Sequence, residues 1–538
     1  MASNLQSAFE SQAVGADETW LDAGPADLMF DPTSISGPIL VASTTNYESD
    51  TMSEVPSITF DTRSPATAKF LADQFGEGKI SQTATITGDG NADKVHVDLG
   101  TQHDFFGDGL QFSNWSAQDA FVIDATSDGS DTIVGTSVND TIVALGGEND
   151  AVNGGGGNDT IEMGANFDDT ASIEGGGGVN TLKLDGDYSA GTIIDSTMMQ
   201  NIQKLVLAAG NSYEFFFEQG VVGAGQKLTI DGAQLHASDS LYLNLANDAV
   251  GKYVVDAGAG LTSIFMNGNA DTIHGGSGGL DVIFDSETPL IKADHIDGGN
   301  SGGNNNLYLT GDYSAGFTFG ASTLQNFQNI ELHDGFNYKL ATVDATVAPG
   351  QTMTVDASSL SAAYSLDFNG SKETDGNFIL NGGAGNDVLT GGAGNDTFDG
   401  GGGADRLSGN GGSDSFVYSF VSDSTSTTHD TIVGFDALTD NFVLQGNLLH
   451  VGAVDAAVTA GKLTSGNFDA NLATAIGVNQ LHPTDAVLFT PSTGNLAGHT
   501  FLIVDENGVA GYQAGQDLVI DITGATNLAQ FGMANFTT

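Results

Sequence analysis

The sequence predicts an all-β protein: a parallel β-roll or β-solenoid built from nonapeptide repeats, with a capping region at each end. Three observations lead to this fold: a nine-residue repeat rich in Gly and Asp, a longer tandem repeat with alternating apolar residues, and very little helical periodicity. Glycine supplies 75 of 538 residues and proline only 9, so the glycines serve frequent turns.

The charge of the chain limits its partners. With 68 acidic and 13 basic side chains, the formal net charge is −55. Such a field repels nucleic acid and anionic membranes, so we expect no nucleic-acid partner and look to cations for neutralisation. Hydrophobic residues still make up 39% of the chain, which excludes a disordered acidic tail.

The residue usage excludes disulfides and Cys-ligated metal sites, and it disfavours a membrane-spanning protein. The chain has no cysteine, so it has neither disulfides nor a Cys-ligated metal site. The first thirty residues lack the basic and apolar regions of a Sec signal, and no stretch approaches 18 consecutive apolar residues. We therefore expect no membrane span.

The nine-residue repeat is clearest from residue 382 to 417, where the chain reads GGAGNDVLT, GGAGNDTFD, GGGGADRLS and GNGGSDSFV. Its aspartates are Asp387, Asp396, Asp405 and Asp414. Each is followed two positions later by an apolar residue, which is expected to be the buried centre of a three-residue strand. A flexible linker of similar composition has no reason to keep that apolar position.

This pattern predicts calcium sites. Calcium prefers six to eight oxygen ligands, which carboxylates and loop carbonyls supply together. Glycine at Gly383, Gly385, Gly392 and Gly394 is expected to allow positive φ and to turn the carbonyls inward. With two nonapeptides in each coil, Asp387 is expected to face Asp405 across one ion, and Asp396 to face Asp414 on the other side.

These four repeats resemble those of the RTX (repeats-in-toxin) proteins, and the segment after them resembles the region that closes the β-roll of serralysin-like members. The resemblance implies several bound Ca²⁺ ions and an export signal at the uncleaved C-terminus. It also implies passage through a type I secretion ABC transporter, folding in extracellular calcium, and a place outside or on the surface of a Gram-negative bacterium.

Looser copies of the repeat occur upstream. The first block places aspartates at spacings of nine, ten and nine residues, and they are Asp131, Asp140, Asp150 and Asp159. A second block offers Asp271 and Asp281, while Asn180 stands where the repeat has aspartate. We predict calcium binding at both blocks, with metal-free glycine turns as the alternative.

A longer repeat joins these blocks, because residues 180–207 align without gaps to residues 305–332, 125 positions later. We divide the chain into an N-terminal cap or anchor (1–80), a first RTX-like block (81–179), repeat unit 1 (180–304), repeat unit 2 ending in the nonapeptide β-roll (305–417), and a β-rich C-terminal cap with the secretion signal (418–538). Only 65–76 and 456–462 are predicted to be helical, and 500–524 is predicted to form three antiparallel strands with a tight turn at 505–508.

The sequence does not indicate an enzyme. None of the ten histidines begins the HExxH motif of serralysin-type proteases. Two GxSxG matches, around Ser277 and Ser301, lie in glycine-rich repeats without the strand–turn–helix context that a nucleophile needs. His96, His274 and His295 are read as surface or packing residues, and paired carboxylates of a glycosidase are left open.

The leading hypothesis is a calcium-binding structural protein that self-assembles as an S-layer, a filament or a biofilm matrix component. The first alternative is an adhesin that binds cell-surface polysaccharide or lipopolysaccharide, with Trp20 and Trp115 as candidate stacking residues. The second is a polysaccharide-active enzyme on the solenoid.

Overall fold

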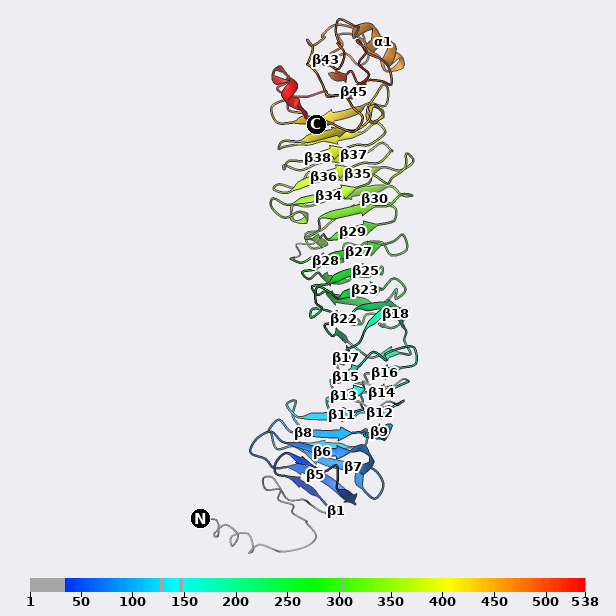
Figure 1. Cartoon of the computed structure of the whole chain (residues 1–538), viewed down its shortest axis with the longest axis vertical. Helices are drawn as coiled ribbons and strands as arrows, with labels where there is room; N and C mark the ends of the chain where they lie inside the picture. Colours follow the sequence, from blue (N-terminus) through cyan, green and yellow to red (C-terminus); the bar gives the residue numbers. More distant parts are fainter. Residues whose placement is uncertain (1–33, 126–128, 145–148, 301–303, 538) are drawn as a thin grey trace. The chain divides into compact units, whose positions relative to one another are not determined.

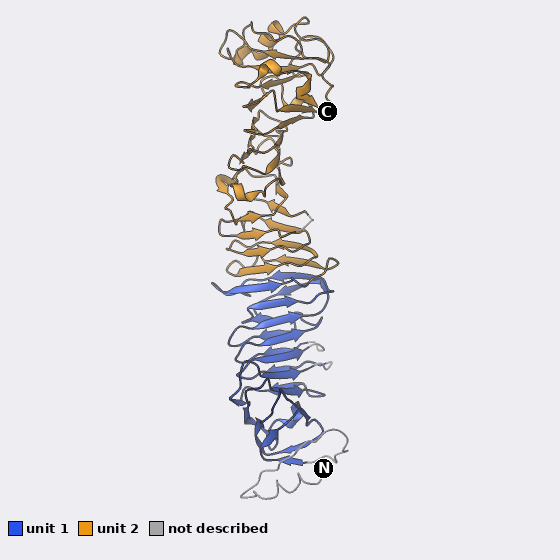
Figure 2. Cartoon of the chain, turned by 90° about the vertical axis from the view of Figure 1, so that its left-hand side faces the viewer, with its two compact units in different colours: residues 1–234 blue, residues 235–538 orange. Residues whose placement is uncertain are grey.

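The computed structural model describes residues 34–125, 129–144, 149–300 and 304–537. The chain divides into two compact units, residues 1–234 and 235–538, which Figure 2 shows in different colours. In both, short strands follow one another along the chain and pair in parallel with strands of neighbouring coils (Figure 1). The all-β solenoid predicted from the sequence is confirmed.

Unit 1 begins with residues of the predicted N-terminal cap. Its strands there pair in parallel in two small sheets, β1 (Ser34–Ser36) with β4 (Thr51–Ser53), and β10 (Gln111–Ser113), β7 (Ile80–Thr87), β5 (Val55–Phe60) and β2 (Ile39–Val41) in that order.

The solenoid strands of unit 1 form parallel sheets, and alternate residues of the longer strands are buried, as in β8 (Lys94–Asp98) and β11 (Ala120–Asp124). One sheet runs β3 (Thr45–Asn46), β6 (Thr67–Leu71), β8, β11, β13 (Asp140–Ala144), β15 (Thr160–Met163), β17 (Thr181–Leu184), β20 (Lys204–Leu207) and β22 (Lys227–Asp231). A second runs β9 (Asp104–Phe106), β12 (Thr132–Val134), β14 (Ala151–Asn153), β16 (Ser172–Glu174) and β19 (Met199–Gln200), and β18 (Tyr188–Ile194) pairs with β21 (Tyr213–Phe217).

Unit 2 repeats this arrangement. One run of strands is β24 (Lys252–Asp256), β26 (Thr272–His274), β28 (His295–Asp297) and β31 (Leu324–Gln325). Another is β23 (Ser240–Asn244), β25 (Leu261–Phe265), β27 (Leu280–Phe284), β29 (Asn306–Leu309), β32 (Asn329–Leu332), β34 (Thr352–Asp356), β36 (Asn377–Asn381), β38 (Thr397–Asp399), β40 (Ser415–Tyr418), β42 (Asn441–Leu444) and β46 (Phe536–Thr537). The third is β30 (Tyr313–Thr318), β33 (Tyr338–Ala341), β35 (Leu366–Asn369), β37 (Val388–Thr390), β39 (Arg406–Ser408), β41 (Asp430–Val433), β45 (Leu518–Asp521), β44 (Phe501–Val504) and β43 (Ala486–Phe489).

The nonapeptide strands stack as the nine-residue period predicts. β37 pairs with β39 and β38 pairs with β40, each 18 residues along the chain, so two nonapeptides make one coil. The central apolar residues Leu389, Phe398, Leu407 and Phe416 are all buried. Consecutive nonapeptides therefore lie in different sheets, and each coil stacks its apolar centres on those of the next.

The last coil meets a region of different design. β45 pairs in parallel with β41 but antiparallel with β44, and β44 pairs antiparallel with β43. The helix α1 (Phe468–Ala475) packs Phe468 and Leu472 into a core with residues of all three antiparallel strands. The remaining helical segments are short 3₁₀ turns: η1 (Ala72–Gln74), η2 (Asp344–Thr346), η3 (Val421–Asp423), η4 (Ser465–Asn467), η5 (Leu528–Gln530) and η6 (Met533–Asn535). Within the described ranges, no helix has the length and apolar character needed to cross a bilayer.

The two helices predicted from the sequence are wrong. In 65–76 the chain forms β6, whose alternate residues Ala68 and Phe70 are buried, and only η1 is helical. In 456–462 the backbone pairs with the chain around β43, where the amide of Val458 donates to the carbonyl of Leu488. A neighbouring strand offers these residues hydrogen bonds that outweigh their local helical preference.

The prediction for 500–524 needs a similar correction. Two strands of this segment, β44 and β45, pair antiparallel with each other. The third strand of the antiparallel sheet, β43, pairs with β44 but lies outside this segment. The turn at 505–508 is not a tight hairpin, because the chain continues as a loop to Asp517. That loop places the ring of Tyr512 in the apolar core beside α1, where its hydroxyl donates to Asp469.

Replacing Phe398 by Ala tests the stacked core. Its side chain is fully buried and its ring stacks on that of Phe416 with centroids 5.3 Å apart. We expect a loss of about 3–5 kcal/mol in the free energy of unfolding with calcium present, measured by chemical denaturation. Phe420→Ala is the control, because Phe420 is 51% exposed and its loss should cost no more than about 0.5 kcal/mol. Equal losses in the two variants would contradict this packing.

Candidate metal centre

The aspartates of the nonapeptides form two columns in unit 2, one in each sheet of the roll. In the first, the amide of Asp387 donates to Oδ1 of Asp405 over 2.8 Å. In the second, the amide of Asp396 donates to Oδ1 of Asp414 over 2.9 Å. All four side chains are buried. The structure therefore brings together the two pairs that the sequence spacing predicts.

Each column continues one coil further than the repeats identified in the sequence. The amide of Asp405 donates to Oδ1 of Asp430 over 2.9 Å, and that of Asp414 donates to Oδ1 of Asp440 over 3.1 Å. The sequence analysis missed both residues because the glycines of the motif are absent there. A signal was present, since each aspartate precedes a buried apolar residue by two positions: Ile432 and Phe442.

Carboxylate oxygens in these columns are buried without partners. Oδ2 of Asp405 and Oδ2 of Asp430 have no hydrogen-bond partner. Burial, together with the neighbouring carboxylate, raises the pKa of Asp405, and burial raises the pKa of Asp414 to about 7. A buried carboxylate is costly unless a positive charge compensates it. A cation held between the coils would supply that charge.

The four predicted motif glycines are required for a reason other than the one expected. None of Gly383, Gly385, Gly392 and Gly394 has positive φ. A Cβ on Gly385 would lie 2.0 Å from the carbonyl oxygen of Tyr364, and one on Gly394 would lie 2.1 Å from that of Gly376. Glycine is needed here because each loop lies directly against the loop of the preceding coil.

Positive φ occurs in the next two repeats instead, at Gly401, Gly403 and Gly412. The asparagine before each of the first two motif aspartates also has a role that the sequence analysis missed. Oδ1 of Asn386 accepts the amide of Ala404, and Oδ1 of Asn395 accepts the amide of Ser413. These asparagines hold successive loops in register beside the aspartate columns.

The first RTX-like block has the same construction in unit 1. The amide of Asp131 donates to Oδ1 of Asp150, and the amide of Asp140 to Oδ1 of Asp159. Asn180 continues the second column by accepting the amide of Asp159. Oδ2 of Asp131, Asp150 and Asp159 is buried without a partner, so this block also fits a cation.

The second block forms only one of the two expected positions. Asp271 joins a column, donating its amide to Oδ1 of Asp294, and its own Oδ2 has no partner. The prediction that Asp281 occupies such a position is wrong. The column position is Leu280, whose amide donates to Oδ1 of Asn305.

Asp281 lies one residue along β27 from that position. Successive side chains of a strand point to opposite faces, so its carboxylate faces outward and accepts a hydrogen bond from the side chain of Asn306. The 125-residue offset of the longer repeat could have predicted that Leu280 takes the column position, since it aligns Asp271 with Asp396 but Leu280 with Asp405.

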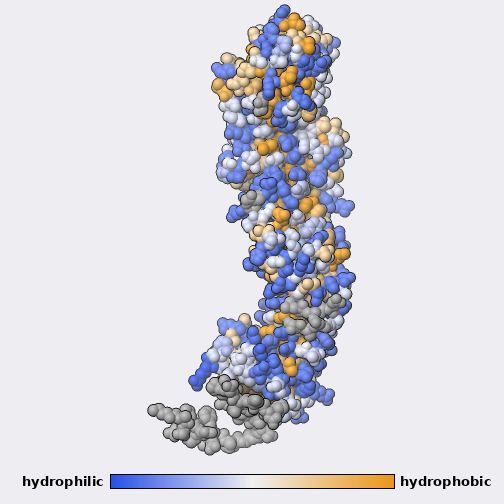
Figure 3. Space-filling model, in the orientation of Figure 1, coloured by the Kyte–Doolittle hydropathy of each residue, from blue (hydrophilic) through white to orange (hydrophobic). Residues whose placement is uncertain are grey.

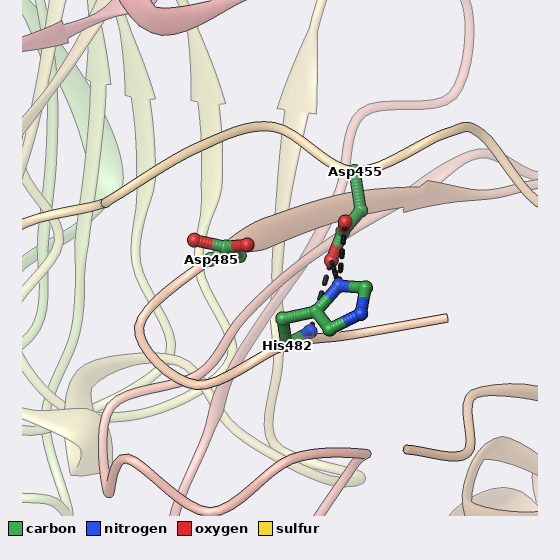
Figure 4. Close-up of side chains that lie close together, drawn as sticks. All are labelled: Asp455, His482 and Asp485. Carbon is green, nitrogen blue, oxygen red and sulfur yellow. Dashed lines mark hydrogen bonds and ion pairs between the residues drawn. The ribbon is translucent and has the colours of Figure 1, made fainter. Parts of the chain in front are cut away.

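The histidines considered in the sequence analysis sit beside aspartates on the rungs. Nδ1 of His274 lies 2.7 Å from Oδ1 of Asp256, and Nε2 of His96 lies 3.6 Å from Oδ2 of Asp124. In the C-terminal region, Asp455, His482 and Asp485 form a further cluster, shown in Figure 4. Nδ1 of His482 there lies 2.8 Å from Oδ1 of Asp455, so the imidazole is held within the cluster itself.

Comparison with known proteins agrees with this geometry. A family model described as the RTX calcium-binding nonapeptide repeat matches residues 126–161 and 381–416. No curated protein matches the chain. The two matched ranges contain the aspartate columns of the first block and of the β-roll, and no enzyme family is matched.

The chain thus carries calcium-binding repeats, and its residues fit the ion. Calcium is bound by carboxylate and carbonyl oxygens, and the stacked loops present both on successive coils. A bound ion would supply positive charge to the columns, while the chain positions the carboxylates by burying the adjacent apolar residue and by the hydrogen bonds from backbone amides to Oδ1.

Stability should depend on pH in opposite senses with and without calcium. Burial raises the pKa of Asp387 and of Asp396 from 3.8 to about 6. A pKa that is higher in the folded chain contributes stability below pH about 4 and loses it as the pH rises through about 6. The chelated protein should therefore melt at a higher temperature at pH about 5 than at pH about 8.

Calcium should reverse this order, because it binds the ionised carboxylates that are favoured at the higher pH. Thermal melts followed by circular dichroism, with chelator and with calcium at both pH values, measure the four midpoints. The same order of midpoints in chelator and in calcium would contradict the assignment of the columns as calcium ligands.

Gly385→Ala tests the close stacking of the loops. The added methyl group would collide with the carbonyl of Tyr364, so we expect a loss of about 1–3 kcal/mol in unfolding free energy and weaker calcium binding. Gly466→Ala is the matched control, because no atom lies within 4 Å of the added Cβ. Calorimetry of both variants measures the difference, and a Gly385→Ala protein as stable as the control would rule out the contact.

Proposed function

We propose that this chain, with its two matched blocks of RTX calcium-binding nonapeptide repeats, is an extracellular structural protein. It folds when calcium binds and then assembles with copies of itself at the cell surface or in the surrounding matrix. The observation that carries the proposal is the set of stacked, buried carboxylates. Without a cation these groups repel one another, so metal binding and folding are coupled.

The extracellular location follows from the same coupling. A chain whose folded state is much less stable without calcium stays largely unfolded in the cytosol and is competent for export by a type I secretion ABC transporter, as the resemblance to RTX proteins implies. The absence of cysteine is compatible with this route, because no disulfide has to form after export. Calcium outside the cell then acts as the signal to fold.

Assembly is supported by the charge and by the surface. A net charge of −55 keeps copies apart unless divalent cations screen or bridge them. On the face shown in Figure 3, hydrophobic residues are scattered among hydrophilic ones. Calcium-bridged contacts between acidic surfaces suit such a face better than a hydrophobic interface does, which favours a calcium-dependent lattice or filament.

The adhesin alternative receives no specific support. Trp115 is half-buried and packs its ring against Phe60 and Phe112, with centroids 6.1 and 5.4 Å away. Trp20 lies outside the described residues. The enzyme alternative rests on no matched family, and the GxSxG match around Ser301 also falls partly outside the described residues.

A calcium titration tests the proposal. Circular dichroism and light scattering are recorded on the full chain from excess chelator to about 10 mM calcium, a range that covers weak extracellular sites. We expect β-structure to appear first and large assemblies to follow at higher calcium. Magnesium at the same concentration is the control and should support neither step. A chain that folds but stays monomeric would contradict assembly, and one that ignores calcium would contradict the whole proposal.

A further inference from the structure

Three carboxylates outside the nonapeptide repeats lie together at one side of unit 2. Asp344 opens η2, while Glu373 and Asp375 lie in the loop between β35 and β36. One carboxylate oxygen from each lies within 4.8 Å of those of the other two. Oxygens that ligate one calcium ion at about 2.3–2.6 Å lie at most about 5.2 Å apart, so the spacing here lets all three carboxylates reach one ion.

Glu373 is the buried member of the group. The residue is only 1% exposed. Its Oε1 accepts hydrogen bonds from the amides of Thr374, Asp375 and Gly376 over 3.1, 3.3 and 3.0 Å. Its Oε2 is buried without a hydrogen-bond partner. Three amide donors fix the carboxylate in place and leave one oxygen free, which is the arrangement that a metal ligand requires.

The two exposed carboxylates lie beside Glu373. Oδ1 of Asp344 accepts both the amide and the hydroxyl of Thr374, over 3.0 and 2.5 Å, which ties η2 to the loop of the next coil. Asp344 and Asp375 line a surface hollow of about 320 Å³, together with Gln325 and Asn326. The hollow has room for the water molecules that complete a calcium coordination shell.

No positive side chain compensates the cluster. Among the described residues, no lysine, arginine or histidine nitrogen forms an ion pair with Asp344, Glu373 or Asp375, although such pairs occur elsewhere, as between Lys339 and Asp367. Three carboxylates so close together destabilise the fold unless a cation joins them.

The tandem repeat provides an internal comparison. At the 125-residue offset, the counterparts of Asp344, Glu373 and Asp375 are Gln219, Asp248 and Val250. Repeat unit 1 therefore lacks two of the three carboxylates.

The buried acid of repeat unit 1 also has its oxygen satisfied. The hydroxyl of Tyr253 donates to Oδ2 of Asp248 over 2.7 Å. The counterpart of Tyr253 is Phe378, which has no hydroxyl to offer Glu373. Only the second repeat thus combines three acids with an unsatisfied buried oxygen.

We propose that Asp344, Glu373 and Asp375 bind one calcium ion one coil before the nonapeptide loops, where the carbonyl of Glu373 accepts the amide of Ala393 over 3.0 Å. All three donors are hard carboxylate oxygens, which favour calcium over nitrogen- or sulfur-seeking metals. The ion joins η2 to the loop before β36, and so fixes the coil that immediately precedes the nonapeptide roll. The site does not depend on the assembly proposed above.

Counting bound ions tests this site on the full chain. Native mass spectrometry and equilibrium dialysis with calcium give the number of ions per chain for the wild type and for the Asp344→Asn/Asp375→Asn variant. Both substituted residues are exposed, so the fold should be retained. We expect the variant to bind one ion fewer at saturation, or to bind one ion at least about tenfold more weakly.

Two further variants keep the test decisive. Glu373→Gln removes the buried charge and should lose the same single ion. Asp187→Asn/Asp312→Asn removes two exposed carboxylates from turns elsewhere and should keep every ion. An unchanged ion count and affinity in the Asp344→Asn/Asp375→Asn variant would overturn the site, as would an equal loss in the control. A wild-type chain that stays monomeric would leave this count unaffected, so the failure of assembly and the failure of the site are distinguishable.

Discussion

The fold depends on how the negative charge of its columns of buried carboxylates is compensated. A coil of the roll closes only if its aspartate turns inward, where its Oδ1 accepts the amide of the preceding coil, as Asp405 does for Asp387. The second oxygen of Asp405 is then buried with no hydrogen-bond partner. Each coil added to the column increases the repulsion as well as the burial of apolar residues. A cation between the coils removes the repulsion between carboxylates, so that the burial of apolar residues can stabilise the stack.

This constraint explains the composition of the chain. Glycine is required where loops of successive coils touch, as at Gly385 and Gly394, and the stack could not be this close with any side chain there. Acidic residues outnumber basic ones 68 to 13, so the lysines and arginines are too few to neutralise the carboxylates. The protein is thereby linked to the calcium concentration of its surroundings, which is the basis of the function proposed for it.

The C-terminal ends of the two aspartate columns show how the stack of parallel coils is terminated. Asp430 and Asp440 extend the columns past the last recognisable repeat, and β45 then turns the sheet antiparallel. An antiparallel layer with its own core beside α1 ends the stacking of parallel strands. A terminal coil left open would present unpaired strand edges, which favour uncontrolled association.

The sequence by itself determined the parts of this protein that repeat. A period of nine with an apolar residue two positions after each aspartate is sufficient to define the coil, the buried centres such as Phe398, and the pairs Asp387–Asp405 and Asp396–Asp414. These follow from local spacing, because every coil repeats the same contacts with its neighbours. Only the tertiary structure decided the positions where the period is broken.

Asp281 faces outward because the column position falls on Leu280, one residue earlier than the motif suggests, and a shift of one residue exchanges the faces of a strand. Within residues 65–76 the chain forms the strand β6 because β8 lies beside it and pairs with it. Asp344 and Glu373 lie close together because η2 stacks on the loop of the next coil, although nothing in their sequence spacing marks them as a pair. Spacing along the chain predicts contacts between equivalent positions, whereas contacts between inequivalent ones depend on the stacking geometry.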